Sequence, residues 1–494
     1  MPSDPSAHVW GELADDAVAD RIVESALAVA DGHSEYADVR LIEAEEMRLY
    51  TQVGADPDER LEHSRGIGVR VLVDGAWGFA SRPLMDREDA EVAARQALAS
   101  ARASAGVTAP VKLEPMSPAS GRYESAVEID PFTVGADVRQ CLLDEVLANV
   151  SRSSSVVAAQ AGLNAKRQHR HLGNSEGSRQ HQHFVETGGG VIATASGHGD
   201  VQRRSYPNSF HGNTAGAGWE YVATLDLAAQ AVRVGEEAVA LLTAPVAPAG
   251  RADVVLGPQQ VSLQIHESSG HALELDRILG DEANYAGTSF IGVDDIGSLR
   301  YGSPAVTITS DPTIPGTRGS FAFDDEGTPA RRTRLVDEGI VRATLSNRDA
   351  AARSGQELTG AARADGWGYL PVCFATHVYL EPGSGSLDEL LDRLGDGVYA
   401  DDNRSWSIDN RRWNFQFGTE VAYEVRNGKR GRLLKNFSYG GTTPQFWGSV
   451  EAVAGPEELR IFGYPCGKGE PKQWGFLSHA AAPVLVRDLR IGVA

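Results

Sequence analysis

Two histidines five residues apart, in the stretch IHESSGHALELD (265–276), place the strongest constraint on how this chain folds. An α-helix turns about 100° per residue, so His266 and His271 would lie about 140° apart around a regular helix. Both imidazoles can face one ion only if the helix is widened or broken between them. A π-bulge adds one residue to a turn and is frequent at functional sites. Gly270 tolerates such a distortion and lets another segment come close, so the stretch predicts a kinked metal-binding helix.

The residue types in HESSGH match the needs of a zinc peptidase. Such a site requires imidazole, thiolate or carboxylate ligands, one coordination position for water, and a nearby carboxylate that takes the proton of the water. Glu267 stands next to His266, as the glutamate does in a zinc-protease HExxH helix. The alternative is a surface helix that happens to contain two histidines.

A third ligand has to come from elsewhere, and the sequence offers three candidates. Glu274 and Asp276 follow His271 by three and five residues, so either could reach the ion or orient His271 from behind. Cys466, in IFGYPCGKGE, stands between a proline and a glycine, and we expect a loop that could hold a thiolate still. A single cysteine is also often a small buried hydrophobic residue.

The composition limits the class of protein. A length of 494 residues exceeds one ordinary core, so two or more domains are expected. The net charge of −21 argues against a nucleic-acid surface. Three cysteines without a CxxC pair favour a reducing compartment. The sequence shows neither a signal-peptide pattern nor the roughly 20 apolar residues of a membrane span. We therefore expect a cytoplasmic protein.

The first half of the chain shows a repeated order of elements. Apolar residues at helical spacing predict a helix over 14–31, followed by extended segments over 36–53 and 66–81 and a second helix at about 88–103. A similar order of helix, strands and helix follows over 132–242. We interpret residues 1–242 as an N-terminal α/β domain with antiparallel sheets, flanking helices and a possible internal duplication.

The second half differs in character. TAPVAPAGR, at 243–251, is typical of a linker. Beyond it, short β-rich segments separated by turn signals predict a mainly antiparallel β domain over 252–494, with the metal-binding helix near its start. The fold class expected for the whole chain is α+β.

Four stretches taken together resemble one family. HESSGHALELD, FDDEGTP (323–329), VAYEVRNGK (421–429) and CGKGE (466–470), in this order and at these distances, are similar to the TldD/PmbA metallopeptidases. The resemblance extends over most of the chain and includes the NSEG turn at 174–177. Because the HExxxH motif is complete, the chain resembles the catalytic, TldD-like subunit rather than the TldE/PmbA-like companion, which lacks the motif.

The resemblance implies a zinc peptidase with one Zn²⁺ per catalytic chain. Its ligands would be His266, His271 and Cys466, with Glu267 as general base. The implied fold is an N-terminal α/β domain followed by a β domain that holds the metal. The implied substrates are unfolded or extended peptides, including ribosomally made peptide precursors, and the implied assembly is a dimer with a TldE/PmbA-like sister subunit or with a second copy.

A second hypothesis comes from a different class of function. The chain could be a non-catalytic binding or scaffold subunit whose zinc site is structural. A structural zinc site is closed by four protein ligands, and Glu274 or Asp276 would then be the fourth.

The remaining sequence features give weaker evidence about function. The tail after Cys466 has a tryptophan, a phenylalanine and a histidine where family members commonly have a smaller, glycine-rich stretch. His377 and His479 each stand alone and are read as structural, and the acidic residues 324–326 are read as turn formers. Four histidines flank the NSEG turn and could form a second metal site, although a solvated polar hairpin face is the favoured reading: His169, His171, His181 and His183.

Overall fold

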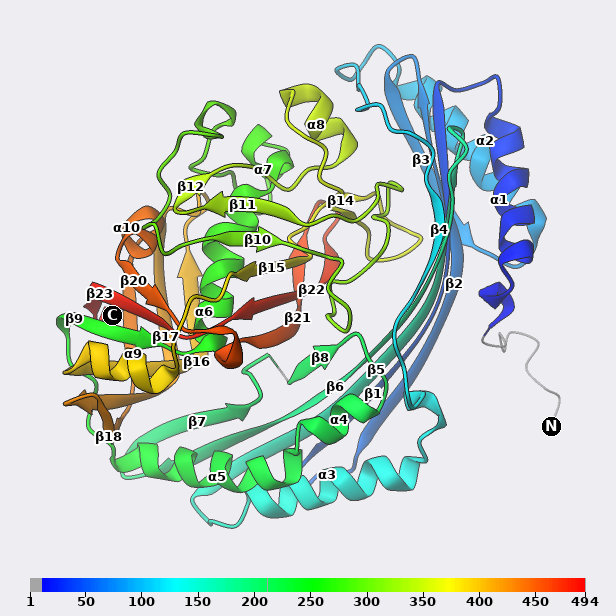
Figure 1. Cartoon of the computed structure of the whole chain (residues 1–494). Coiled ribbons are helices and arrows are strands. Elements are labelled where there is room, and N and C mark those ends of the chain that lie inside the picture. The colour runs from blue at the N-terminus through cyan, green and yellow to red at the C-terminus, as the bar shows by residue number, and fades with distance from the viewer. Residues whose placement is uncertain (1–10, 211, 494) are drawn as a thin grey trace.

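The computed structural model describes residues 11–210 and 212–493, and it shows three large β-sheets with helices around them (Figure 1). The chain is a mixed α+β protein, as the sequence predicts. One sheet is built from strands before residue 216, and the other two are built from strands after residue 249. The linker predicted at 243–251 lies between these two sets of strands, and the assignment of separate domains stays a prediction.

The first sheet is long and curved (Figure 1). Its strand order is β3-β2-β1-β5-β6-β4, and β7 and β8 also pair with β6. Every pairing in it is antiparallel except that of β4 with β6. The strands are β1 (Tyr36–Gln52), β2 (Asp58–Val73), β3 (Ala76–Pro83), β4 (Ser120–Glu124), β5 (Val156–Asn174), β6 (Arg179–Gly197), β7 (Asp200–Tyr206) and β8 (Asn213–Ala215).

Helices cover the outer, convex side of this sheet (Figure 1). Helix α1 shows why: Ala19, Val23, Ala26 and Ala30 recur at helical spacing and are buried against the sheet. The order is α1, three strands and α2, and then, after β4, α3, four strands, α4 and α5; β1 and β5 are the neighbours at the centre of the sheet. The helices are α1 (Asp16–Ala30), α2 (Arg87–Ser104), α3 (Ala136–Val150), α4 (Glu220–Thr224) and α5 (Leu227–Thr243).

The second sheet closes on itself. β16 pairs with both β9 and β17, so β16, β9, β23, β19 and β17 form a ring, with β18 and β20 at its sides. Closure leaves the ring strands without a free edge. The strands are β9 (Gly250–Leu256), β16 (Gly397–Ile408), β17 (Asn414–Arg426), β18 (Lys429–Leu434), β19 (Ser438–Thr442), β20 (Val450–Val453) and β23 (Val484–Ile491).

The third sheet has the order β12-β11-β10-β15-β22-β21. Helix α6 (Pro258–Ile265) packs against β16 of the ring and against β15, β21 and β22 of this sheet. The segment that follows α6 is therefore held between two sheets. The strands are β10 (Ile308–Ser310), β11 (Thr333–Asp337), β12 (Ile340–Val341), β15 (His377–Leu380), β21 (Arg460–Lys468) and β22 (Gln473–Ala481), and β13 (Ala362–Arg363) pairs separately with β14 (Val372–Cys373).

The second half is mainly antiparallel β, as expected. The structure adds two parallel pairs, β15–β22 and β16–β9, and several helices besides the one expected to bind a metal. Helix α9 (Leu387–Leu394) begins with a capping box formed by Ser386 and Glu389, a start signal that the sequence analysis passed over. The further helices are α7 (Leu275–Leu279), α8 (Arg348–Ser354) and α10 (Thr443–Gly448), and the short 3₁₀ turns are η1 (Glu12–Ala14), η2 (Pro131–Thr133), η5 (Val293–Asp295) and η6 (Pro456–Glu458).

Among the described residues, no helix has both the length and the apolar character needed to cross a membrane.

The acidic stretch 324–326 forms the predicted turn. Asp324 accepts hydrogen bonds from the backbone N–H groups of Glu326 and Thr328 at 2.9 and 2.8 Å. The next carboxylate points to the curved sheet, where Asp325 pairs with Arg170 of β5 at 3.2 Å. This turn therefore joins the second half of the chain to the first sheet.

A buried ion pair reinforces the same junction. Arg70 of β2 contacts both Asp38 of β1, at 2.6 Å, and Glu326, at 2.9 Å. The side chains of Arg70, Asp38 and Glu326 are 5%, 0% and 1% exposed. One guanidinium is thus shared by two carboxylates that have almost no access to water.

We expect Arg70→Met to lower the free energy of unfolding by about 3–5 kcal/mol, because removing one partner of a buried pair leaves uncompensated buried charges. Chemical denaturation of the variant and the wild type measures the loss. Arg60→Met, on the same strand, is the matched control, since the Arg60 side chain is 65% exposed and an exposed ion pair contributes little to stability. Equal stability of Arg70→Met and wild type would contradict this account.

Candidate metal centre

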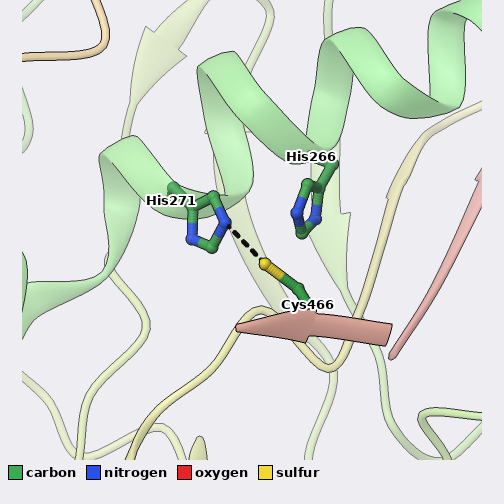
Figure 2. A group of neighbouring side chains, drawn as sticks. All are labelled: His266, His271 and Cys466. Carbon is green, nitrogen blue, oxygen red and sulfur yellow. Dashed lines mark hydrogen bonds between the residues drawn. The ribbon is translucent and has the colours of Figure 1, made fainter. Parts of the chain in front are cut away.

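A widened turn brings the two histidines together. Residues His266–Gly270 (η3) form a π-helical turn directly after α6, and the 3₁₀ turn η4 (His271–Leu273) follows. The ring centroids of His266 and His271 lie 4.4 Å apart, and both rings point to the same side of the helix (Figure 2). The distortion expected from the spacing of the two histidines is confirmed.

Residues from other segments pack against the π-turn and form hydrogen bonds with it. A Cβ atom on Gly270 would lie 3.0 Å from the Cβ of Ala375, so a glycine there allows the close approach of another segment. The hydroxyl of Tyr301 donates to the carbonyl oxygen of Ser268 at 2.7 Å, and the indole of Trp447 donates to the Ser268 hydroxyl at 2.9 Å. Buried aromatic side chains therefore bond to polar groups of a turn that lacks regular α-helical bonding.

Cys466 lies on strand β21 and faces the two histidines. The prediction that Cys466 lies in a loop is wrong. Cys466 lies opposite Gly475 of β22 in an antiparallel pair. Its Sγ atom is 3.2 Å from Nε2 of His271, and Figure 2 shows the thiol directed at the histidine pair. The ligand atoms of His266, His271 and Cys466 all lie within 4.8 Å of one another. The structure thus brings the three predicted ligands into one group.

Hydrogen bonding fixes the tautomer of His271. Its Nδ1 atom lies 3.1 Å from the carboxylate of Glu274. A carboxylate accepts hydrogen bonds, so Nδ1 carries the proton and Nε2 keeps a free lone pair that faces Cys466. Glu274 therefore orients His271 from behind rather than joining the group of ligands. Partners of this kind are typical of metal-binding histidines.

His266 is fixed by His479, which the sequence analysis read as an isolated structural residue. Nδ1 of His479 lies 2.9 Å from the carbonyl oxygen of Val378, which can only accept, so Nε2 of His479 is an acceptor. Nδ1 of His266 lies 2.8 Å from that Nε2 and must donate to it. Nε2 of His266 therefore keeps its lone pair, and His479 belongs to the surroundings of the site.

Lys468 is a further residue that the sequence analysis missed. Its Nζ atom donates to Glu274 at 3.0 Å, to Asp276 at 2.7 Å and to the Cys373 carbonyl at 2.7 Å. Asp276 thus forms an ion pair with Lys468 and has no hydrogen bond to either histidine. Residues two apart on a strand share a face, so the placement of Cys466 on a strand would have pointed to Lys468 as well.

Burial shifts the pKa values of the three candidate ligands. His266 and His271 are each 3% exposed, and burial lowers the pKa of both imidazoles well below the usual value, which keeps them neutral. Burial, followed by the charges of Glu267 and Glu274, raises the pKa of the Cys466 thiol. A divalent ion would reverse this last effect, because a thiol that coordinates a metal is deprotonated. Two neutral imidazoles and one thiol are a donor set that suits zinc.

Glu267 is buried beside this group and is paired with an arginine. Its carboxylate accepts a hydrogen bond from Nη1 of Arg412 at 2.6 Å, and Glu267 is 7% exposed. Burial raises the pKa of Glu267, while the guanidinium of Arg412 opposes the rise. Arg412 has a φ of 62° in the turn between β16 and β17. No local sequence signal links Arg412 to Glu267, because the pair is formed only by the fold.

If Cys466 is a ligand, Cys466→Ser replaces a soft thiolate by a poor ligand and should release the metal. We expect the purified variant to contain less than a tenth of the zinc held by wild type, as measured by elemental analysis after dialysis against a weak chelator. Cys141→Ser is the matched control, since Cys141 is exposed on α3. One tightly held equivalent of zinc in Cys466→Ser would remove Cys466 from the ligand set.

Family models match one segment in each half of the chain. Residues 249–492 match the PmbA/TldA metallopeptidase C-terminal domain, and residues 60–101 match the PmbA/TldA metallopeptidase domain 1. Two solved structures share the fold. A protein of Thermotoga maritima described as a modulator of a DNA gyrase has a TM-score of 0.76 at 18% identity and covers 97% of this chain and 100% of its own. TldE of Thermococcus kodakarensis has a TM-score of 0.74 at 15% identity and covers 96% of this chain and 100% of its own.

Relatives in sequence point the same way. A metalloprotease of Methanocaldococcus jannaschii is 28% identical over 451 residues, which are 90% of this chain and 94% of the relative. A metalloprotease TldD homolog of Haemophilus influenzae is 32% identical over 241 residues, which are 49% of this chain and 48% of the relative. With two of its segments matched by models of one family and with relatives aligned along most of its length, the chain belongs to the PmbA/TldD metallopeptidase family.

Proposed function

We propose that this chain is a zinc-dependent peptidase of the HExxxH type that cleaves unfolded or extended peptides. One observation carries the proposal: His266 and His271 each present a free Nε2 lone pair to Cys466, and the buried carboxylate of Glu267 lies on the same turn. Zinc held by these three ligands would supply Lewis-acid polarisation of a peptide carbonyl and would lower the pKa of water.

The residues of the chain would then move the proton. In this proposal a carboxylate oxygen of Glu267 takes the proton from the attacking water and passes it to the leaving amine. Arg412 would keep Glu267 ionised, because its positive charge at 2.6 Å favours the carboxylate. Exclusion of water around the buried site strengthens both effects.

An extended substrate fits the position of Cys466. Strand β21, which carries it, is the last strand in the order of the third sheet, and β22 is the only strand to which it is paired in the described part of the chain. Asn213 bonds to Ile461 and Gly463 on the outer edge of β21, and Pro465 has no N–H. A peptide could therefore add through main-chain hydrogen bonds only at the end of the strand next to Cys466, with little dependence on side chains. Maturation of a ribosomally made peptide is one use of such an activity.

The alternative, a scaffold with a structural zinc site, is not favoured by the contacts. A closed site needs a fourth ligand, and Glu274 and Asp276 were the candidates. The carboxylate oxygens of Glu274 accept from His271, Arg277, Lys468 and Ala375, and those of Asp276 accept from Arg277, Lys468 and Cys373. Neither carboxylate is directed at the free Nε2 atoms of His266 and His271 or at the Sγ atom of Cys466.

We also propose a cytoplasmic enzyme that works as a pair of subunits. Cys141, Cys373 and Cys466 are all free thiols, which is the usual state in a reducing compartment. The partner would be a TldE/PmbA-like sister chain or a second copy, since a pair of subunits could enclose a peptidase site and spare folded proteins.

Glu267→Gln should keep the metal and lose peptide cleavage, because the amide has nearly the shape of the carboxylate but cannot take a proton. We expect the turnover number to fall at least about 100-fold, within the range attributed to general-base catalysis. A fluorogenic unfolded peptide reports cleavage, and elemental analysis reports zinc in the same preparation. A variant that retains full activity would eliminate Glu267 as the base.

Arg412→Met should move the acid limb of the pH–activity profile to higher pH. Loss of the guanidinium removes the interaction that lowers the pKa of Glu267, so the base becomes protonated at a higher pH than in wild type. The profile of kcat/KM against pH measures the shift at unchanged zinc content. Arg411→Met, at the exposed neighbouring position, should leave the profile in place, and an unshifted limb in Arg412→Met would contradict the pairing.

The paired assembly makes a separate prediction. Light scattering on the chain expressed alone, and after co-expression with a sister chain, should show a dimer in the preparation that cleaves unfolded peptides. A stable monomer that cleaves them at the full rate would show that pairing is unnecessary.

A further inference from the structure

The histidine hairpin at the NSEG turn is not a solvated polar face. His171 pairs across β5 and β6 with His181, and His169 pairs with His183. The side chains of His171, His181 and His183 are only 1%, 14% and 16% exposed, because the start of helix α1 lies over them. The favoured sequence interpretation of this hairpin is therefore wrong.

One carboxylate oxygen faces three of these imidazoles. Oδ1 of Asp16, the first residue of α1, lies 3.9 Å from Nδ1 of His171, 3.5 Å from Nδ1 of His181 and 3.8 Å from Nε2 of His183. Two ligand atoms of a tetrahedral zinc ion with bonds of about 2.0–2.1 Å lie roughly 3.3 Å apart. The ligand atoms of Asp16, His171 and His183 all lie within 4.8 Å of one another, whereas Nδ1 of His181 lies 2.7 Å from Nδ1 of His171 and is hydrogen-bonded to it.

Two of the ligand atoms of Asp16, His171 and His183 are buried without a hydrogen bond. Oδ1 of Asp16 and Nε2 of His183 have no hydrogen-bond partner among the described residues. The other oxygen of Asp16 accepts from Arg122 at 2.6 Å, which turns Oδ1 toward the imidazoles. Buried polar atoms without partners are costly in a folded protein, and a bound cation would satisfy both of these.

The outer nitrogens of the same imidazoles face oxygen atoms. Nε2 of His171 lies 2.7 Å from the carbonyl oxygen of Leu13, so it must carry the proton. Nδ1 of His171 is therefore an acceptor, and it accepts from Nδ1 of His181 at 2.7 Å. Nε2 of His181 lies 3.5 Å from Asp20, and Nδ1 of His183 lies 3.8 Å from Glu124. Oxygen atoms behind each ring are the arrangement that orients histidines toward a metal.

We propose that Asp16, His171 and His183 bind a divalent first-row transition metal ion, with zinc as the expected occupant, and that the ion replaces the hydrogen bond between His171 and His181. Two imidazoles and one carboxylate form a donor set that zinc accepts. The site draws its ligands from α1, β5 and β6. It fastens the N-terminal end of α1 to strands β5 and β6, and it is separate from the group around Cys466, which lies on a different sheet.

Zinc stoichiometry tests the proposal. The double variant Asp16→Asn/His183→Gln should contain one equivalent of zinc less than the wild-type chain, whatever the occupancy of the Cys466 group. His33→Gln, an exposed histidine outside the cluster, should leave the content unchanged. An unaltered zinc content in the double variant would overturn the proposal.

A second measurement isolates this site and its structural role. In a His266→Ala/Cys466→Ser background, which removes the other ligand group, added zinc should still bind with a stoichiometry of one and should raise the melting temperature by several degrees. Adding Asp16→Asn/His183→Gln to that background should abolish both effects. A background chain that binds no zinc in a chelator-buffered titration, or a zinc-induced rise that survives the added substitutions, would refute the assignment.

Discussion

The candidate metal centre depends on hydrogen bonds that hold the outer nitrogens of two buried histidines. His271 is fixed by Glu274, and His266 is fixed by His479, which is itself fixed by a backbone carbonyl. Each bond selects one tautomer, so both Nε2 lone pairs face Cys466 before any ion is present. A site with preset tautomers loses little entropy when it binds a cation, because the rings are already oriented.

Charge balance around this core explains the further residues. Glu267, Glu274 and Asp276 are buried carboxylates, and each contacts a cation from a distant part of the chain. Lys468 contacts two of them while standing two residues from Cys466 on the same face of β21. One short strand thus supplies both the thiol and the ammonium group that stabilises the support of His271. A buried lysine without these carboxylates would be strongly unfavourable.

Local patterns predicted much of the fold and part of the site. The helix expected over 14–31 is α1 (Asp16–Ala30), and the spacing of His266 and His271 around Gly270 indicated the π-turn. Cys466 was placed in a loop because proline and glycine flank it, yet cross-strand pairing with β22 decided its structure. His479 and Arg412 could not be connected to the site from sequence, since each lies more than 140 residues from its partner.

The curved sheet is tied to the metal-binding half through the acidic turn at 324–326. Asp325 contacts Arg170 of the sheet, and it also accepts from the backbone of Ala364. Ala362, two residues earlier, pairs with Cys373, whose N–H donates to Asp276 beside Lys468. An unbroken series of buried contacts therefore runs from the sheet to the residues that support His271. A displacement of the sheet would have to strain this series, so the first half of the chain has a physical means of setting the geometry of the centre.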